Sequence, residues 1–289
     1  MEATTTSRPL LLQACLNGNR RPVDHPALPP DPERLAAAAV QAVAAGATAL
    51  HVHQRDGDGA QTLAPEPCAR TLLAIREACP GTPVGLTTGA WIEPDPARRL
   101  KLVASWEVTP DYASVNVVED GSVVLVRLLL ERGIGVEAGV WTVADVETLL
   151  ASGLADRCLR VLLEAMEPGV AAALANVAAM ERRLGEAGCR APQLQHGEGS
   201  AAWPVLVRAL EAGRDVRIGL EDVLELPDGH LAGGNGELVA AAARLAHEMG
   251  RRLETVGRAD PPGGRVDPPG GRVDPQGQGG RVLPEAGRP

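Results

Sequence analysis

Short apolar runs with many β-branched residues alternate with amphipathic stretches rich in Ala and Leu from Leu10 to Arg251. This alternation constrains the fold more than any other feature of the chain, because strands that are separated by helices pair in parallel. We predict strands at Leu10–Leu16, Ala49–Val52, Val84–Thr88, Tyr112–Val117, Gly135–Trp141, Leu159–Glu164, Gln193–His196 and Val216–Glu221. The predicted helices include Asp31–Ala45, Pro67–Ala78, Arg98–Trp106, Ser122–Arg132, Val143–Ala151, Val170–Gly185, Ala201–Ala212 and Glu237–Arg251.

Eight strand–helix units in a chain of 289 residues predict an α/β fold of the (β/α)8 type, a TIM barrel. The alternative is an open, doubly wound sheet, which typically carries a G-x-G-x-x-G turn after an early strand. The turn Asn17-Gly18-Asn19-Arg20 does not match that pattern. We therefore expect a closed barrel with its active site at the C-terminal ends of the strands.

The C-terminal segment has a different composition. The heptapeptide Asp-Pro-Pro-Gly-Gly-Arg-Val occurs twice in succession from Asp260, and a variant of it begins at Asp274. Pro and Gly in every unit exclude a helix, and the segment has too little apolar surface to offset the entropy of ordering. We expect a catalytic barrel domain over residues 1–257 and a disordered, low-complexity tail over residues 258–289.

The charge and cysteine pattern restrict the partners and the compartment. A formal net charge of -9 argues against binding to nucleic acid or to an anionic membrane, because both require a basic surface. The five cysteines are scattered without a C-x-x-C pair, which indicates a reduced, cytoplasmic protein. No apolar run approaches the ~20 residues that cross a bilayer. The run Pro9–Leu12 is too short for the apolar region of a signal peptide.

Polar residues gather at the ends of the predicted strands, where a TIM barrel forms its active site. Part of this set is expected to serve ordinary capping and hydrogen bonding. The set comprises Asn17, His51, His53, Arg55, Thr87, Thr88, Ser114, Asn116, Glu137, Glu164, His196, Glu198, Arg217, Glu221 and Asp222.

His51 and His53 stand two residues apart on a predicted strand, so both imidazoles point to one face. Such a pair can share a metal ion, although hydrogen-bonded core histidines fit the same pattern. The last strand neighbours the first in a closed barrel, so Glu221 can supply a third ligand. Two imidazoles, one carboxylate and open positions describe a catalytic zinc site, and iron(II) or manganese could use the same ligands.

Arg217 and Asp222 flank this predicted ligand. Arg217 can pair with a nearby carboxylate and tune its basicity, and a purely structural ion pair is the alternative. The only lysine, Lys101, lies on a predicted helix away from the strand ends, which excludes Schiff-base and pyridoxal-phosphate chemistry. No G-x-S-x-G motif is present. Of the reaction classes considered, metal-assisted carbonyl chemistry is the one that these residues still allow.

Six motifs in this order resemble those of the β-keto acid cleavage enzymes, whose type activity is 3-keto-5-aminohexanoate cleavage. The motifs are Asn17-Gly18-x-Arg20, Asp24-His25-Pro26-Ala27-Leu28-Pro29, His51-Val52-His53-x-Arg55-Asp56, Val136-Glu137-Ala138-Gly139-Val140-Trp141, His196-Gly197-Glu198-Gly199 and Gly219-Leu220-Glu221-Asp222. The resemblance runs from the first predicted strand to the last helix and excludes the tail from Arg258.

The resemblance implies a Zn2+-dependent barrel that converts a β-keto acid and acetyl-CoA into acetoacetate and a new acyl-CoA. It implies that His51, His53 and Glu221 bind zinc. It also implies that Asp222 acts as the base together with Arg217.

The remaining predicted contacts concern the substrate and CoA. By the resemblance, Thr87 or Thr88, Ser114 and Asn17 hold substrate, and Glu137 faces its distal group, where a carboxylate would favour a cationic tail. The alternative is that Glu137 only lines the barrel. Asn235 in Gly233-Gly234-Asn235-Gly236 is a candidate for the CoA phosphates, because a helix N-terminus attracts anions; a flexible loop is the alternative.

One departure from the family pattern bears on the substrate. The segment Ser114-Val115-Asn116-Val117-Val118 lacks the Gly- and Met-rich continuation of many members, which leaves the keto acid open. Two other functional hypotheses stay open. The first is a different metal-dependent barrel, either a hydrolase or an acyl-CoA lyase of the hydroxymethylglutaryl type. The second is a metal-binding barrel without catalysis. We also expect a homo-oligomer.

Overall fold

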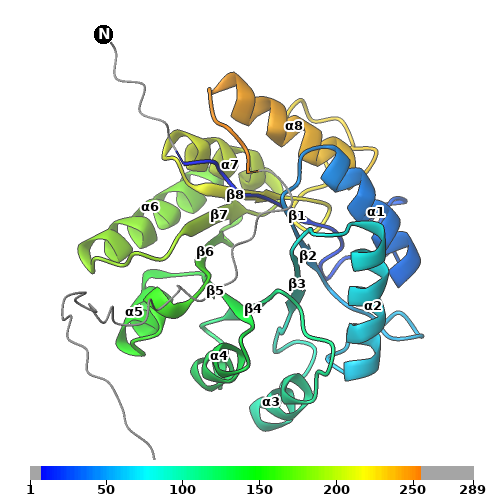
Figure 1. Ribbon diagram of the computed structural model, residues 1–289. Coiled ribbons are helices and arrows are strands. Elements are labelled where there is room, and N and C mark those ends of the chain that lie inside the picture. The colour runs from blue at the N-terminus through cyan, green and yellow to red at the C-terminus, as the bar shows by residue number, and fades with distance from the viewer. Residues whose placement is uncertain (1–7, 255–289) are drawn as a thin grey trace, which may run out of the picture.

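Each strand pairs in parallel with the next one along the sequence, and the last strand pairs with the first, so the sheet closes into a barrel (Figure 1). The computed structural model describes residues 8–254. The strands are β1 Leu12–Cys15, β2 Ala49–Val52, β3 Val84–Thr87, β4 Tyr112–Asn116, β5 Gly135–Val140, β6 Arg160–Ala165, β7 Gln193–Gly197 and β8 Asp215–Ile218. The predicted TIM barrel is confirmed. The predicted tail over residues 258–289 lies outside the described residues.

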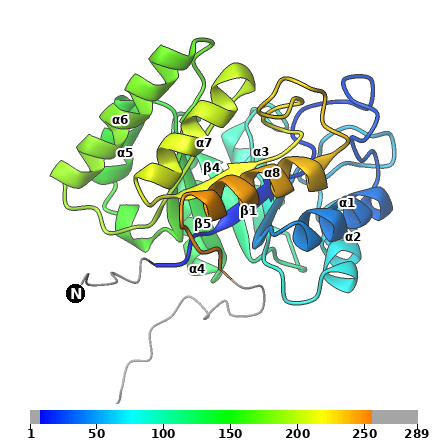
Figure 2. The same ribbon diagram turned by 90° about the horizontal axis from the view of Figure 1, so that it is seen from above.

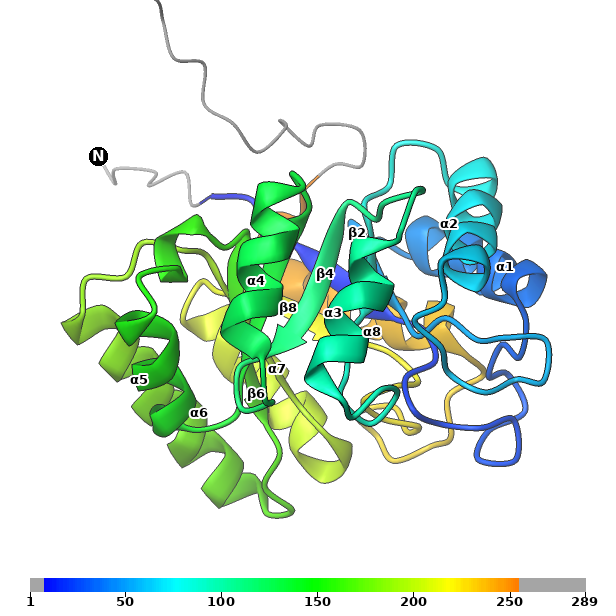
Figure 3. The same cartoon turned by 90° about the horizontal axis from the view of Figure 1, so that it is seen from below.

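A helix follows each strand and lies on the outside of the barrel. The helix α1 lies between α2 and α8 (Figure 2), and α4 packs against both β4 and α3 (Figure 3). None of the helices described between residues 8 and 254 is long and apolar enough to span a membrane. The helices are α1 Pro32–Ala44, α2 Pro65–Ala78, α3 Pro96–Ala104, α4 Ser122–Glu131, α5 Val143–Ala151, α6 Val170–Glu186, α7 Ala202–Glu211 and α8 Asn235–Glu248.

Local sequence signals set several helix starts. Asp31 and Asp95 cap α1 and α3 through their side chains, and each is followed by a proline whose fixed φ suits the first helical turn. Thr142 and Asp145 form a reciprocal capping box at the start of α5. These caps fix where each loop enters its helix and thereby position the loops at the barrel mouth.

The interior of the barrel contains a buried polar layer. Glu137 on β5 accepts hydrogen bonds from Arg160 Nε at 2.7 Å and from Gln13 Nε2 at 2.9 Å. The Arg160 guanidinium carbon lies 4.8 Å from the centre of the Tyr112 ring. The Tyr112 hydroxyl donates to the carbonyl of Leu50 at 2.6 Å. This layer lies beneath the mouth and supports the residues above it.

The turn after β8 corrects one sequence prediction. The strand was expected to reach Glu221, but it ends at Ile218, and both Glu221 and Asp222 lie in the following turn. A Cβ atom at Gly219 would lie 2.0 Å from the carbonyl oxygen of Cys15, so the chain passes close to β1 there and leaves the sheet. The Glu221 amide then donates to that carbonyl at 3.2 Å. The two carboxylates are thus brought over the end of β1.

Candidate active site and metal centre

A cavity of about 520 Å³ opens at the C-terminal ends of the strands. Its size falls within the range of small-molecule sites, roughly 300–1,000 Å³. Its lining combines imidazoles, carboxylates, two arginines and two indoles. The lining residues are Asn19, Arg20, Asp24, His51, His53, Thr87, Trp91, Ser114, Asn116, Trp141, Leu162, Glu164, Met166, Glu198, Arg217 and Glu221.

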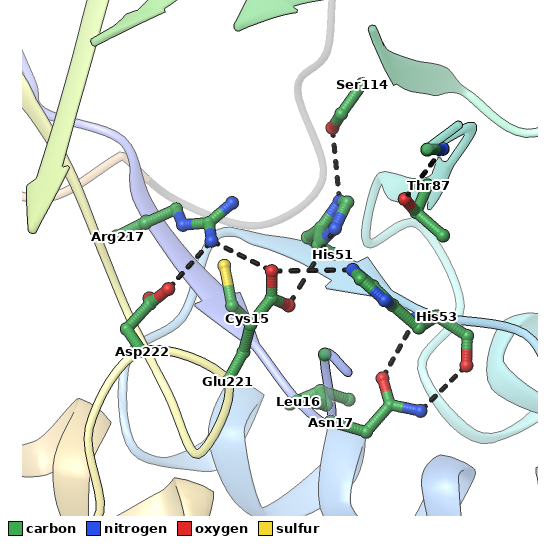
Figure 4. A network of polar contacts seen from close by, with 12 residues as sticks. Cys15, Leu16, Asn17, His51, His53, Thr87, Ser114, Arg217, Glu221 and Asp222 are labelled. Carbon is green, nitrogen blue, oxygen red and sulfur yellow. Dashed lines mark hydrogen bonds and ion pairs between the residues drawn. The ribbon is translucent and has the colours of Figure 1, made fainter. Parts of the chain in front are cut away.

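His51, His53 and Glu221 converge at the β2 side of this cavity (Figure 4). Glu221 Oε1 lies 3.4 Å from His53 Nε2, and Glu221 Oε2 lies 3.8 Å from His51 Nε2. One donor atom of each residue lies within 4.8 Å of the others. Such a group can close around one divalent cation with small side-chain movements. The structure thus brings together the three ligands predicted from sequence.

The surroundings of the two imidazoles fit a metal. His51 Nδ1 lies 3.2 Å from Ser114 Oγ, and His53 Nδ1 lies 2.9 Å from Gln61 Oε1, which leaves both Nε2 atoms to face Glu221. Metal-binding histidines are commonly oriented in this way through the second ring nitrogen. Burial lowers the pKa of His51 to about 4, so the ring is neutral at pH 7, the form that binds metals.

The Glu221 carboxylate also fits a metal. Its Oε2 atom is buried and has no hydrogen-bond partner among residues 8–254, and a cation would satisfy it. Burial alone would raise the pKa of Glu221, but Arg217 and the two imidazoles hold it well below its usual range. The group is therefore a carboxylate at neutral pH and can act as a ligand.

A chain of charged side chains continues from this group across the floor of the mouth. Arg217 Nη2 donates to Glu221 Oε1 at 2.9 Å and to Asp222 Oδ1 at 2.7 Å. His196 Nδ1 lies 3.4 Å from Asp222 Oδ1, and His196 Nε2 lies 3.3 Å from Glu164 Oε2. Burial raises the pKa of Asp222, although Arg217 and His196 act in the opposite direction. Asp222 Oδ2 has no hydrogen-bond partner in the part of the chain that the structure describes.

The family model of the β-keto acid cleavage enzymes matches residues 9–260 of the chain. The chain belongs to this family. It is therefore an enzyme that cleaves a carbon–carbon bond. The family match confirms the resemblance inferred from the motifs.

Two curated relatives of this family member carry the same name. The 3-keto-5-aminohexanoate cleavage enzyme of Fusobacterium nucleatum subsp. nucleatum is 27% identical over 260 residues, which cover 84% of this chain and 93% of the relative. The enzyme of that name from Acetoanaerobium sticklandii is 24% identical over the same shares of both chains.

Solved structures show the same fold. A ternary complex of ObcA with a C4-CoA adduct and oxalate superposes with a TM-score of 0.67 at 18% identity, over 80% of this chain and 66% of ObcA. A binary complex of ObcA with oxaloacetate gives a TM-score of 0.65 at 17% identity, over the same shares. The chain thus spans slightly less than two thirds of the ObcA chain.

Two of the five predicted substrate contacts line the cavity, and three do not. Thr87 and Ser114 line it. The hydroxyl of Thr88 instead donates to the carbonyl of Ser114 at 2.6 Å. Asn17 bonds the backbone of His53 from both ends of its amide, accepting from the His53 amide at 2.9 Å and donating to the His53 carbonyl at 2.7 Å. Asn17 therefore fixes the backbone of the candidate ligand His53, and it is not among the residues that line the cavity.

The predicted roles of Glu137 as a substrate contact and of Asn235 as a CoA phosphate contact also need correction. Glu137 is fully buried and bonded by Arg160, Gln13 and Ser114, so it cannot face the distal end of a substrate. Asn235 is 2% exposed, and its amide accepts from Leu220 N and donates to the Leu16 carbonyl. The Gly233 amide in the same turn already donates to Glu237 Oε2 at 2.6 Å. This turn therefore offers little to a CoA phosphate.

Gln61 and Trp91 contact the candidate ligand His53 and were not predicted from the sequence. Both lie in loops after strands, where no periodic pattern marks them. Trp91 stacks on His53 with ring centres 5.9 Å apart, and its indole nitrogen donates to Gln61 Oε1 at 3.1 Å. Glu164 and Asn116 stood among the polar residues at strand ends, but no role was assigned to them.

Replacing Gln61 with leucine is expected to weaken metal binding about 10- to 100-fold, because His53 loses the partner that orients its ring. Competition with a chromophoric chelator measures this affinity. Asn19→Ala is the matched control, since it removes only the bond that the Gln61 amide donates, at 2.8 Å, and leaves the acceptor for His53. An unchanged affinity in Gln61→Leu would contradict the assignment.

Proposed function

We propose that this enzyme is a zinc-dependent acyltransferase that condenses a β-keto acid with acetyl-CoA and releases acetoacetate and a new acyl-CoA. One observation carries the proposal: in a member of this family, His51, His53 and Glu221 converge beside the Arg217–Asp222 pair at the barrel mouth. The names of the curated relatives and the CoA adduct and oxaloacetate held by ObcA support the substrate classes.

His51, His53 and Glu221 would hold the zinc ion, and three protein ligands leave coordination positions open for substrate. Bound there, zinc supplies Lewis-acid stabilisation of negative charge on the substrate oxygens. Ser114 and Asn17 keep the two histidines in position, as their hydrogen bonds to His51 and to the His53 backbone indicate. Thr87 lies at the cavity wall and offers a hydroxyl to the substrate.

Asp222 is the proposed general base. Arg217 occupies its Oδ1 atom, so the partnerless Oδ2 atom is the one that accepts the proton from C2 of the β-keto acid. The resulting carbanion forms a bond to the acetyl carbonyl carbon of acetyl-CoA, and the carbon–sulfur bond breaks. The CoA thiolate then adds to C3 of the keto acid, the C2–C3 bond breaks, and Asp222 returns its proton to the departing acetoacetate.

Product formation is expected to require both acetyl-CoA and Asp222. Zinc-loaded protein is assayed for acetoacetate and acyl-CoA with a panel of β-keto acids, with and without acetyl-CoA. Asp222→Asn is expected to lower kcat about 10²- to 10⁴-fold, the usual contribution of a general base, while the protein keeps its metal.

Two outcomes would contradict the proposal. Turnover that is independent of acetyl-CoA would favour an acyl-CoA lyase or a hydrolase. Full activity of Asp222→Asn would remove this residue from the role of base. Homo-oligomeric assembly and the domain boundary at residue 257 stay predictions.

A further inference from the structure

Two oxygen atoms converge over a glycine at the wall of the cavity. A Cβ atom at Gly139, near the end of β5, would lie 2.2 Å from Glu164 Oε1 and 2.8 Å from Asn116 Oδ1. Asn116 is the last residue of β4, and Glu164 lies one residue before the end of β6. Because position 139 has no side chain, the groups of the two neighbouring strands fill the space above it. The result is a pair of acceptors at one point of the cavity wall.

Within residues 8–254, neither acceptor oxygen receives a hydrogen bond from a protein donor. Glu164 is 8% exposed, and its Oε1 atom is buried without a hydrogen-bond partner, while Oε2 faces His196. Asn116 Nδ2 donates to Glu119 Oε1 at 3.0 Å, which fixes the amide so that Oδ1 is the atom turned toward Gly139. A buried acceptor without a donor costs about 1–3 kcal/mol, so a ligand that supplies the donor gains affinity there.

This acceptor pair lies across the mouth from the metal ligands. β5 is the fourth strand from β1 in either direction around the closed ring of eight, whereas the metal ligands come from β2 and from the turn after β8. Asn116 and Glu164 line the same cavity as His51 and Glu221. The apolar side chains that line this cavity include Leu162 and Met166, which suit the carbon chain of a substrate.

We propose that Glu164 and Asn116 bind an ammonium group at the distal end of the β-keto acid. The proposal rests on the proposed function, which anchors the keto acid end at the metal ligands. An ammonium carries three donors and can satisfy both acceptors at once, whereas a hydroxyl has one donor and can satisfy only one. The two arginines that line the cavity do not compete, because Arg20 and Arg217 are bonded to Glu221 on the opposite side.

Binding of unreactive analogues tests this assignment. The affinities of zinc-loaded protein for 5-aminohexanoate, 6-aminohexanoate, 5-hydroxyhexanoate and hexanoate are measured by isothermal titration calorimetry. The better of the two amines is expected to bind at least tenfold more tightly than hexanoate. Glu164→Gln is expected to reduce this preference to threefold or less. Glu225→Gln is the matched control: it removes a charge from an exposed site in the loop after β8 that does not line the cavity, and the preference should persist.

Each outcome of this experiment decides the proposal. Equal affinities for the amines and hexanoate in the wild type overturn it without any variant. An undiminished preference in Glu164→Gln overturns the role of Glu164, and 5-hydroxyhexanoate binding as tightly as the amines overturns the ammonium assignment. Binding requires neither acetyl-CoA nor turnover. Failure of the cleavage assay would therefore count against the proposed function and leave this result intact.

Discussion

Replacing Glu221 with glutamine is expected to abolish metal binding at the mouth and, with it, turnover. Glutamine keeps the shape of the side chain but removes the only carboxylate in the group of three ligands. Loss of a ligand costs more than loss of a residue that merely orients one, so we expect the affinity for zinc to fall by more than about 100-fold. Metal content after dialysis, measured by inductively coupled plasma mass spectrometry, gives the result directly.

A comparison with Asp222→Asn separates the roles of the two adjacent carboxylates. Asp222 lies beside Glu221 and shares Arg217 with it, but it is not part of the ligand group. Asp222→Asn should retain zinc and lose turnover, whereas Glu221→Gln should lose both. Zinc bound with wild-type affinity by Glu221→Gln would show that the metal centre is elsewhere.

Replacing Glu137 with leucine is expected to destabilise the barrel by about 3–5 kcal/mol, because Arg160 would remain as a buried charge without its partner. The two side chains form an ion pair of 2.7 Å with side-chain exposures of 0% and 6%. The free energy of unfolding of the metal-free protein, taken from urea denaturation, measures the effect. The metal is removed because metal binding would add its own contribution to the measured free energy of unfolding.

The double variant Glu137→Leu with Arg160→Leu provides the decisive control. With both charges replaced by apolar groups no charge is stranded, so most of the lost stability should return. At the surface, Glu147→Gln breaks an exposed pair with Arg183 and should change stability little. If the double variant were no more stable than Glu137→Leu alone, the buried ion pair would not explain the loss.

The fold could be predicted from sequence because local signals and the global architecture agree. The expected bounds of β2 and α5, Ala49–Val52 and Val143–Ala151, are those of the structure. Caps and glycines mark the ends of most elements. The turn after β8 was misread because Leu220 continues the apolar run, and only the close approach of Gly219 to Cys15 ends the strand.

The candidate site could be predicted in part. The spacing of His51 and His53 predicts that both side chains lie on the same face of a strand. The order of strands in a closed barrel predicts that Glu221 lies near them. Alternation along a strand does not give the height of a side chain within the barrel, since that depends on the stagger between strands. Glu137 pairs in register with Ser114 and Arg160 and so lies one layer below Gly139, where it is fully bonded.

The three candidate ligands come from opposite ends of the barrel sequence, and this has a consequence for biogenesis. His51 and His53 are synthesised early, but Glu221 follows β8, the last strand of the barrel in the sequence. An ion held by all three is a coordination cross-link between segments separated by six further strands of chain. Such a cross-link restricts the unfolded chain most when the enclosed segment is long. If the proposed zinc ion binds to all three ligands, its uptake would report that the barrel has closed.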